Sequence, residues 1–193
     1  YFVDCMYVYG IPGLATSVDR DLVQFPIINA GSPDAHPAHV LADVACMLRY
    51  TRDDLKKARV GWLGCTNGTL FSLIEALRYF PFSLQVALPP LEDRPTLETY
   101  ARHCGVKVDF VYAGCRSGLD DELAQQWKVD DALLSHADQK ARVLLGTSPM
   151  QAIEVASDIL ASPASLLLLQ SENRLRVHKR LLHWVFLENE RVI

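Results

Sequence analysis

A polar turn followed by the start of a helix is the stretch of this chain best suited to chemistry. It reads Asn29-Ala-Gly-Ser32 and then His36-Pro-Ala-His-Val-Leu-Ala-Asp43. Pro37 suits a first helical turn, and the residue before a proline is kept out of the α region, so the spacing places His36 at a helix N-terminus. An imidazole beside exposed backbone N–H groups can bind a carbonyl or a phosphate. The same pattern also fits a histidine that merely caps its helix.

The last predicted helix, near residues 172–187, carries a second concentration of polar residues around an apolar face. Its basic residues are Arg174, Arg176, His178, Lys179, Arg180 and His183. A short basic run of this kind can contact phosphates, as in an RNA backbone, although a solvated helix face gives the same pattern. No aromatic residues alternate with it to form a stacking platform, so the indication of nucleic-acid binding is weak.

From Ala58 onward the chain alternates between apolar strands and amphipathic helices. The predicted strands are Arg59–Leu63, Leu84–Leu88, Val106–Tyr112, Arg142–Leu145 and Ser165–Leu169, and the predicted helices lie near 69–80, 95–103, 129–137, 151–161 and 172–187. Such alternation predicts a parallel, doubly wound sheet covered on both faces. Ligands bind such sheets outside the carboxyl ends of the strands. The loops there are Gly64–Thr69, Ala113–Gly118, Gly146–Gln151 and Gln170–Arg174.

The pattern of the first 57 residues predicts less regular secondary structure than the pattern from Ala58 onward. Residues Phe2–Tyr9 have the pattern of a buried strand, a short helix is expected near Ser17–Gln24, and residues 26–32 form an extended segment. The first strand has no evident partner in this region, and a lone strand is not stable. We therefore expect either a missing preceding domain or another chain that completes the sheet.

Composition excludes several classes of protein. The chain has 193 residues, 50% of them hydrophobic, and a formal net charge of -4, which excludes disorder and a globally nucleic-acid-binding character. The longest apolar runs fall far short of the roughly 20 residues that a membrane span needs. The five cysteines show no metal-like spacing, so we expect reduced thiols, no metal and no cofactor.

Four segments, in order along the chain, resemble the aspartate and ornithine carbamoyltransferases. The His36–Asp43 segment is similar to the family pattern H-P-x-Q-x-L-x-D, and Gly64-Cys-Thr-Asn-Gly68 to its G-D-x-x-N turn. Leu144-Leu-Gly-Thr-Ser-Pro149 lies where ornithine enzymes have F-L-H-C-L-P, and Ser171-Glu-Asn-Arg-Leu175 is similar to their A-E-N-R-L. The resemblance implies a catalytic remnant at His36 and substrate-binding remnants at Asn67, Ser117 and Arg174.

Departures from the family pattern cluster at the same ligand positions. Tyr9 stands where the family has an arginine that binds carbamoyl phosphate, and His39 replaces the glutamine of H-P-x-Q. Gly114 takes the place of an aspartate in the loop that binds the amino acid, and Gly146 and Thr147 replace the histidine and cysteine of H-C-L-P. The family's phosphate-gripping S-x-R-T-R loop has no counterpart here.

These observations predict an α/β fold with a doubly wound parallel sheet like the amino-acid-binding domain of carbamoyltransferases. Residues 1–35 are expected to be a remnant of the carbamoyl-phosphate-binding domain and a linker, and residues 36–193 the amino-acid-binding-like domain. For function we expect a carbamoyltransferase-like protein that has lost catalysis and is a structural subunit of a larger assembly. The alternatives are an active ornithine or aspartate carbamoyltransferase seen only in part, and an amino-acid-binding module.

The expected partners and location follow from that first hypothesis. We expect other protein subunits as partners, with contact to an RNA backbone through Arg174, Arg176, Lys179 and Arg180. The setting suggested by analogy with eukaryotic ornithine enzymes is a mitochondrial assembly such as a ribosome, and otherwise the cytoplasm.

Overall fold

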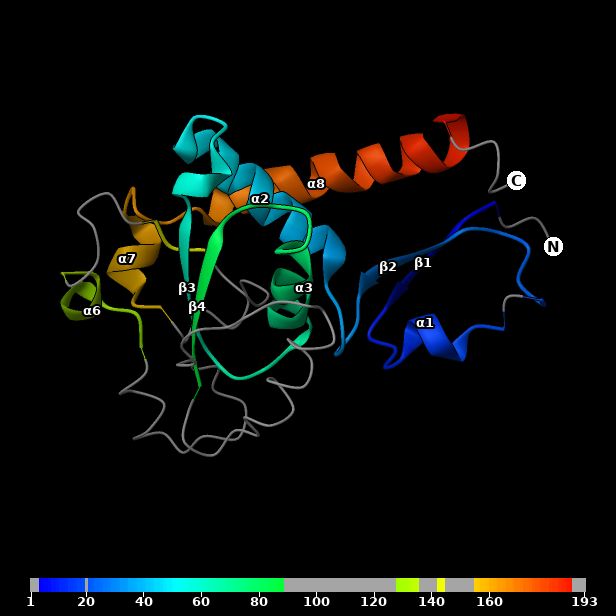
Figure 1. Ribbon diagram of the computed structural model, residues 1–193, viewed down its shortest axis with the longest axis horizontal. Coiled ribbons are helices and arrows are strands. Elements are labelled where there is room, and N and C mark those ends of the chain that lie inside the picture. Colours follow the sequence, from blue (N-terminus) through cyan, green and yellow to red (C-terminus); the bar gives the residue numbers. More distant parts are fainter. Residues whose placement is uncertain (1–3, 20, 89–127, 136–141, 145–154, 189–193) are drawn as a thin grey trace.

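Two parallel strand pairs, joined by helices, make up the part of the chain that the structure describes (Figure 1). The computed structural model describes residues 4–19, 21–88, 128–135, 142–144 and 155–188. The predicted helix at 95–103 and the predicted strand Val106–Tyr112 lie outside these ranges. Parallel strands connected by helices confirm the predicted α/β class. The proposed domain boundary at residue 35 stays a prediction.

The first strand does have a partner, and our expectation of a lone strand was wrong. Strand β1 (Met6–Tyr9) pairs in parallel with β2 (Ile27–Gly31), which forms within the extended segment predicted at residues 26–32. The short helix α1 (Leu14–Ser17) lies in the crossover between them, earlier than the helix predicted at Ser17–Gln24. A parallel pair needs a long crossover, and the 17 or so residues between these strands are enough for one.

The second strand pair forms the centre of the main body. Strands β3 (Arg59–Leu63) and β4 (Ser83–Ala87) pair in parallel, and α3 (Gly68–Ala76) connects them. Helix α2 (Pro37–Thr51) packs against α3, and the 3₁₀ turn η1 (Leu55–Lys57) leads from it to β3. Buried apolar side chains of these elements form the core, among them Val40, Val44, Leu55, Leu73 and Phe82. Their burial is the main stabilising contribution.

Two short helices and two isolated bridges lie at the edge of the main body. They are α6 (Asp131–Ser135), α7 (Ser157–Ala161), and the parallel bridges Val129–Val155 and Val143–Ser165. The strand predicted at Ser165–Leu169 is wrong, because helix α8 (Leu167–His183) already begins inside it. A run of leucines fits a helix as well as a strand, and periodicity cannot separate the two over so short a stretch.

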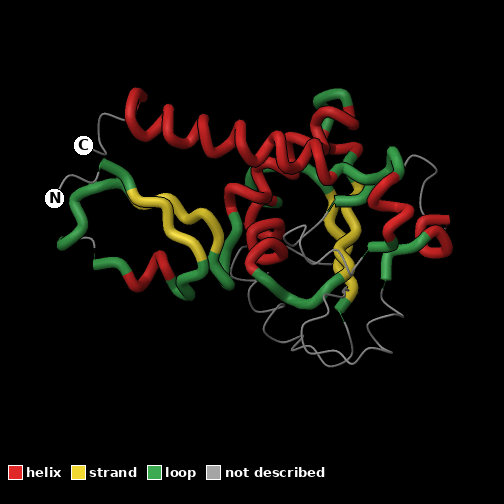
Figure 2. Tube along the Cα trace, turned by 180° about the vertical axis from the view of Figure 1, so that it is seen from behind, coloured by secondary structure: helices red, strands yellow, loops and turns green. Residues whose placement is uncertain are grey.

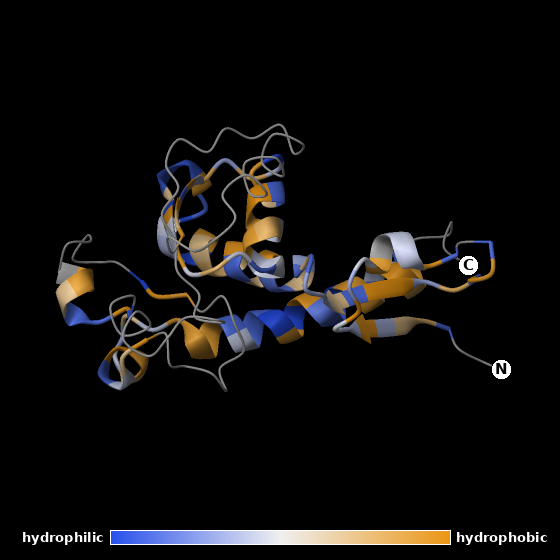
Figure 3. Cartoon of the chain, turned by 90° about the horizontal axis from the view of Figure 1, so that it is seen from below, coloured by the Kyte–Doolittle hydropathy of each residue, from blue (hydrophilic) through white to orange (hydrophobic). Residues whose placement is uncertain are grey.

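Helix α8 connects the main body to the β1–β2 pair. It packs along α2 and then passes over β1, where the hydroxyl of Tyr7 donates to the backbone oxygen of His178 at 3.2 Å (Figures 1 and 2). Hydrophilic residues follow much of its length, whereas β1 and β2 are mainly hydrophobic (Figure 3). This single helix therefore brings side chains of the C-terminal segment to the junction between the two strand pairs.

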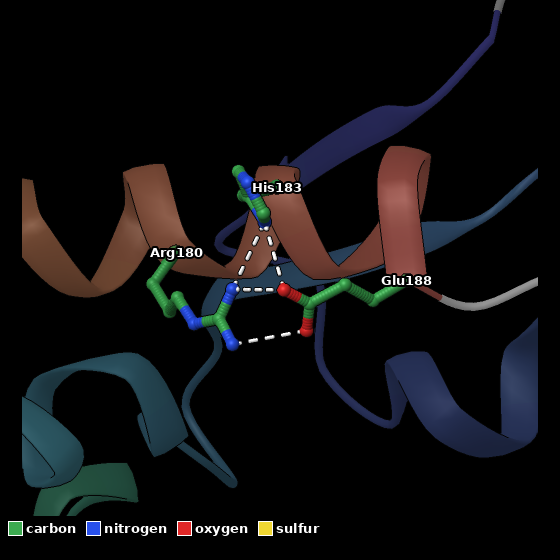
Figure 4. A network of polar contacts seen from close by, with 3 residues as sticks. All are labelled: Arg180, His183 and Glu188. Atoms are coloured by element: carbon green, nitrogen blue, oxygen red, sulfur yellow. Dashed lines mark hydrogen bonds and ion pairs between the residues drawn. The ribbon is translucent and has the colours of Figure 1, made fainter.

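A π-helical turn, η3 (Trp184–Glu188), ends α8. Glu188 accepts two hydrogen bonds from the Arg180 guanidinium, at 2.6 and 2.9 Å, and lies 3.1 Å from Nδ1 of His183 (Figure 4). All three side chains are exposed, so we expect this network to contribute little to stability. Among the described helices, none combines the length and the apolar character that a membrane crossing requires.

Candidate functional site

His36 lies where the N-termini of α2 and α3 meet. Its place at the start of a helix was predicted from its position before Pro37. It is the N-cap residue of α2, and its backbone N–H donates to the hydroxyl of Ser72 at 2.9 Å and to the carbonyl of Gly68 at 3.1 Å. Both acceptors belong to α3. The start of α2 is thus fixed against the start of α3, and the imidazole has a defined position.

The turn before His36 is held by its own polar side chains. Oδ1 of Asn29 accepts from the N–H of Gly31 at 2.9 Å, and Ser32 exchanges backbone hydrogen bonds with Ala35 at 2.8 and 3.2 Å. Gly31 has φ of 144°, and a Cβ there would lie 2.9 Å from the His36 ring. Only glycine allows this approach. The turn and the imidazole therefore form one packed unit.

His39 stacks on His36 one helical turn further along α2. The two Nδ1 atoms are 3.2 Å apart, and the ring centroids are 5.2 Å apart with planes 24° from parallel. Burial is the first cause that lowers both pKa values, and the charge of Arg174 is the second. The pKa of His39 falls to about 3. Both rings are therefore neutral at pH 7 in the unliganded protein.

Arg174 and His178 lie one turn apart on α8, near the imidazoles: the Arg174 charge acts on both rings, and His178 acts on His39. Nε of Arg174 and Nδ1 of His178 are buried and have no hydrogen-bond partner among the described residues. Burial lowers the pKa of His178, and the nearby Arg174 charge lowers it further. Buried polar atoms are rarely left without a partner in a folded protein, and each one calls for an explanation. A bound polar ligand would supply those partners.

Two polar side-chain contacts join α2 to α8. The amide of Gln170 donates to the carboxyl of Asp43 at 2.7 Å, and the amide of Asn173 donates to Sγ of Cys46 at 3.3 Å. Asp43 and Gln170 are both almost fully buried. Burial raises the pKa of Asp43 to about 6, against the opposing effects of the Gln170 hydrogen bond and of Arg174.

Asn67, which the family resemblance makes a substrate-binding residue, has a structural role at the start of α3. Its Oδ1 accepts from the N–H groups of Thr69 and Leu70 at 3.0 and 3.1 Å, and it is the N-cap of α3. This is the usual task of an asparagine at a helix start. The following residue, Gly68, packs directly against His36. Ser117, Gly114, Gly146 and Thr147 lie outside the described residues.

Tyr9, at the end of β1, closes the site on the side of the first strand pair. Its ring lies edge-on to His36, with centroids 6.4 Å apart, and 72% of the residue is exposed. Tyr7, two residues earlier, lies 5.4 Å from the His178 ring. The site therefore has an imidazole pair, a guanidinium and aromatic side chains, drawn from β1, α2 and α8.

His36 and Arg174 were predicted from the sequence, but other polar residues of the site were not. His178, Asp43 and Gln170 were not predicted as part of the site. Their signal was present as spacing, because His36, His39, Asp43 and Cys46 recur every three or four residues along α2. Gln170, Arg174 and His178 recur every four residues along α8. Two polar stripes at helical spacing predict facing helices, but not which faces meet.

No family model matches the sequence. The chain is, however, 30% identical over 97% of its length to the ornithine carbamoyltransferase of Nitratidesulfovibrio vulgaris strain DP4, of which it covers 69%. It is 32% identical over 86% of its length to the Oleidesulfovibrio alaskensis enzyme of the same name, of which it covers 63%. The chain belongs to the carbamoyltransferase family. Membership confirms the resemblance seen in its four motifs.

Solved structures of carbamoyltransferases share the fold. The ornithine carbamoyltransferase of Gloeobacter violaceus matches 94% of this chain with a TM-score of 0.77 at 22% identity, and the match covers 69% of that structure. The Thermus thermophilus ornithine carbamoyltransferase matches 94% with a TM-score of 0.77 at 23% identity, covering 66% of that structure. These likenesses confirm the predicted carbamoyltransferase fold.

Our expectation of an inactive structural subunit of a mitochondrial ribosome-like assembly was wrong. The relatives are named as carbamoyltransferases, and those named above come from bacteria. One structural argument for a scaffold also fails, because β1 pairs with β2 of the same chain. Single losses such as Tyr9 do not remove the groups that helix α8 brings near His36. The predicted partner contacts through Arg174, Arg176, Lys179 and Arg180 stay a prediction.

Proposed function

We propose that this protein is a carbamoyltransferase that transfers the carbamoyl group of carbamoyl phosphate to the amine of an amino acid, with ornithine as the acceptor to test first. The relatives' names supply the substrate class. The observation that carries the proposal is the buried Nε of Arg174. It has no hydrogen-bond partner in the described part of the chain, and its guanidinium charge acts on the imidazoles of His36 and His39.

The reaction needs few groups from the protein. The amine nitrogen attacks the carbonyl carbon, the new C–N bond forms, the C–O bond to phosphate breaks, and the amine loses a proton. Negative charge grows on the carbonyl oxygen and then on the leaving phosphate, and preorganised donors lower the barrier by stabilising it. Arg174 supplies a fixed cation, and His36 supplies an imidazole held by the contacts of its backbone and ring.

Tyr9 is the main departure from an ordinary carbamoyl phosphate site. A phenol can donate one hydrogen bond, whereas a guanidinium offers a charged fork. We propose that the cationic contribution missing at Tyr9 comes from Arg174, whose charge acts on both imidazoles. Asn67 and Ser117 stay proposed substrate-binding residues, with Asn67 also capping α3.

A transfer assay tests the proposal. Purified protein is incubated with carbamoyl phosphate and either L-ornithine or L-aspartate, and citrulline or carbamoyl aspartate is measured together with released phosphate. We expect the carbamoylated product with one acceptor, and a loss of about 10²-fold or more in rate for His36→Ala, since single transition-state donors contribute that much. Arg174→Ala should act similarly.

Arg176→Ala is the matched control, because Arg176 lies two residues away on α8 and pairs with Glu172 at the surface. It should leave the rate unchanged. Absence of product with both acceptors would contradict the proposal. Binding of an amino acid without any transfer would favour the amino-acid-binding module instead.

A further inference from the structure

We infer that His36 and His39 share a proton across their facing Nδ1 atoms, and that binding of a phosphoryl or similar tetrahedral dianion at this site draws one additional proton into the pair. This inference rests on the proposed function for the location of the ligand, and it deepens that function by assigning a role to His39. His39 stands where the family pattern has a glutamine, an amide that cannot titrate.

The two rings contact each other through their Nδ1 atoms. At 3.2 Å, one Nδ1 must carry a hydrogen and the other must accept it. In the neutral pair, the ring that donates through Nδ1 has a bare Nε2, whereas its partner carries its hydrogen on Nε2. The outward side of the neutral pair therefore offers one donor and one acceptor.

A single added proton changes that outward side. It binds to the bare Nε2, so that both Nε2 atoms become donors and the pair gains a positive charge, while the internal Nδ1 contact is kept. A second added proton would place two N–H groups against each other at 3.2 Å, which is unfavourable. The pair is thus limited to one extra proton.

The charged and titratable groups around the pair keep it neutral without a ligand. Arg174 and His178 face it from α8, and Tyr9 faces it from β1. On α2 itself, Asp43 is directed to Gln170. Asp34, in the preceding turn, accepts from the N–H of Gly13. No described carboxylate contacts either imidazole. A backbone hydrogen bond with Ser32 favours protonated His36, but burial and the Arg174 charge outweigh it and lower the pKa of His36.

A tetrahedral dianion reverses this balance. Its negative charge offsets Arg174, and its oxygens prefer two outward N–H donors to one donor and one acceptor. The same oxygens could accept from the buried Nε of Arg174. The dianion therefore selects the singly protonated pair, and protonation of the pair is coupled to binding.

Sulfate is the probe that isolates this coupling, because it stays a dianion between pH 5.5 and pH 8.5, roughly, and takes up no proton itself. Isothermal titration of the purified protein with sulfate, in buffers that differ in ionisation enthalpy, counts the protons taken up. We expect up to one proton per sulfate at pH 7 to 8, and an affinity that rises by up to about tenfold for each unit by which the pH is lowered.

His39→Gln is the decisive variant, since glutamine keeps a hydrogen-bonding side chain and removes the shared proton. We expect proton uptake to disappear and sulfate affinity to become nearly independent of pH. His183→Gln is the control, because His183 lies near the end of α8 and contacts Arg180 and Glu188 instead. It should keep the wild-type uptake.

The outcomes separate this inference from the proposed function. Sulfate binding without proton uptake in the wild type, or uptake that persists in His39→Gln, would overturn the inference even if carbamoyl transfer is found. No detectable binding of sulfate or carbamoyl phosphate at pH 6 would overturn it as well. Proton-coupled sulfate binding without any carbamoyl transfer would support the inference and count against the proposed function alone.

Discussion

The amide of Gln170 donates a hydrogen bond to the buried carboxyl of Asp43, across the contact between α8 and α2, at 2.7 Å. Both side chains are 3% exposed or less. The contact joins residues 127 positions apart, and the charge of Arg174 acts on the Asp43 carboxyl. Because the Asp43 carboxyl is buried and its pKa is raised, the effect of pH on the free energy of unfolding can be tested at this contact.

Asp43→Asn should make the folded protein more stable at neutral pH. The folded-state pKa of Asp43, about 6, lies above its ordinary value of 3.8, so the folded protein holds this proton at a pH where the unfolded chain has lost it. Stability from this group is therefore present at low pH and is lost as the pH rises through about 4 to 6. An asparagine keeps an acceptor for Gln170 and has no charge to bury.

The expected difference follows from the size of that shift. A shift of roughly two units corresponds to up to about 3 kcal/mol at pH 7. Denaturant unfolding of wild type and Asp43→Asn, measured from pH 4 to pH 8, checks it. The gap between the two should narrow toward pH 4. Equal stability at pH 8, or a gap that widens in acid, would show that burial does not disfavour the Asp43 carboxylate.

Gly68→Ala should strongly destabilise the junction of α2 and α3. A Cβ at this position would lie 2.6 Å from Cδ2 of His36 and 2.7 Å from the backbone nitrogen of Ala35. Backbone atoms cannot move aside cheaply, so we expect a loss of about 2–4 kcal/mol in the free energy of unfolding, within the range of severe single substitutions.

Gly61→Ala supplies the comparison, because a Cβ there meets nothing within 4 Å. Gly61 lies in β3, where alanine should be neutral or slightly stabilising. Thermal unfolding of both variants separates the effect of contact from the effect of replacing a glycine. Similar melting temperatures for the two would contradict the packing that the structure gives at Gly68.

The sequence predicted local elements better than it predicted which elements meet. Residues 59–63 form the predicted strand with its predicted ends, and Pro37 starts α2 as its chemistry requires. The pairing of β1 with β2 was missed, since both strands are short and the connection between them carries only one helical turn. Strand pairing depends on contacts distant in sequence, which local patterns do not contain.

In the site, too, local features could be predicted from the sequence, whereas contacts between distant segments could not. His36 was found because proline fixes the backbone next to it, and Arg174 because of its place in a family motif. His39 was noted only as a departure from that motif. Its stacking on His36 follows from helical spacing. The contribution of α8 could not be derived, because nothing local in residues 167–183 says that this helix reaches β1.

Arg174→Lys should lower carbamoyl transfer by about 10²-fold, through loss of the guanidinium geometry rather than of charge. A lysine ammonium is a compact cation without the planar fork that matches a phosphate, and it loses its proton more readily when buried. Initial rates at varied carbamoyl phosphate concentration measure the effect. Arg176→Lys, on the exposed side of the same helix, should leave the rate unchanged. A rate for Arg174→Lys near the wild-type value would mean that any cation suffices there.

Tyr9→Arg should strengthen the binding of carbamoyl phosphate, because it returns a guanidinium to the position where the family pattern has one. Tyr9 is largely exposed and its ring lies beside His36, so an arginine can extend into solvent next to the site without burying its charge. A charge-assisted contact contributes roughly 1.5–3 kcal/mol, so we expect the KM for carbamoyl phosphate to fall by about tenfold or more. Tyr79→Arg, at an exposed tyrosine just after α3, adds the same charge elsewhere and should leave KM unchanged. An equal fall of KM in both variants would mean that the added charge attracts the anionic substrate only at long range. An unchanged KM in Tyr9→Arg would mean that position 9 does not contact the phosphate.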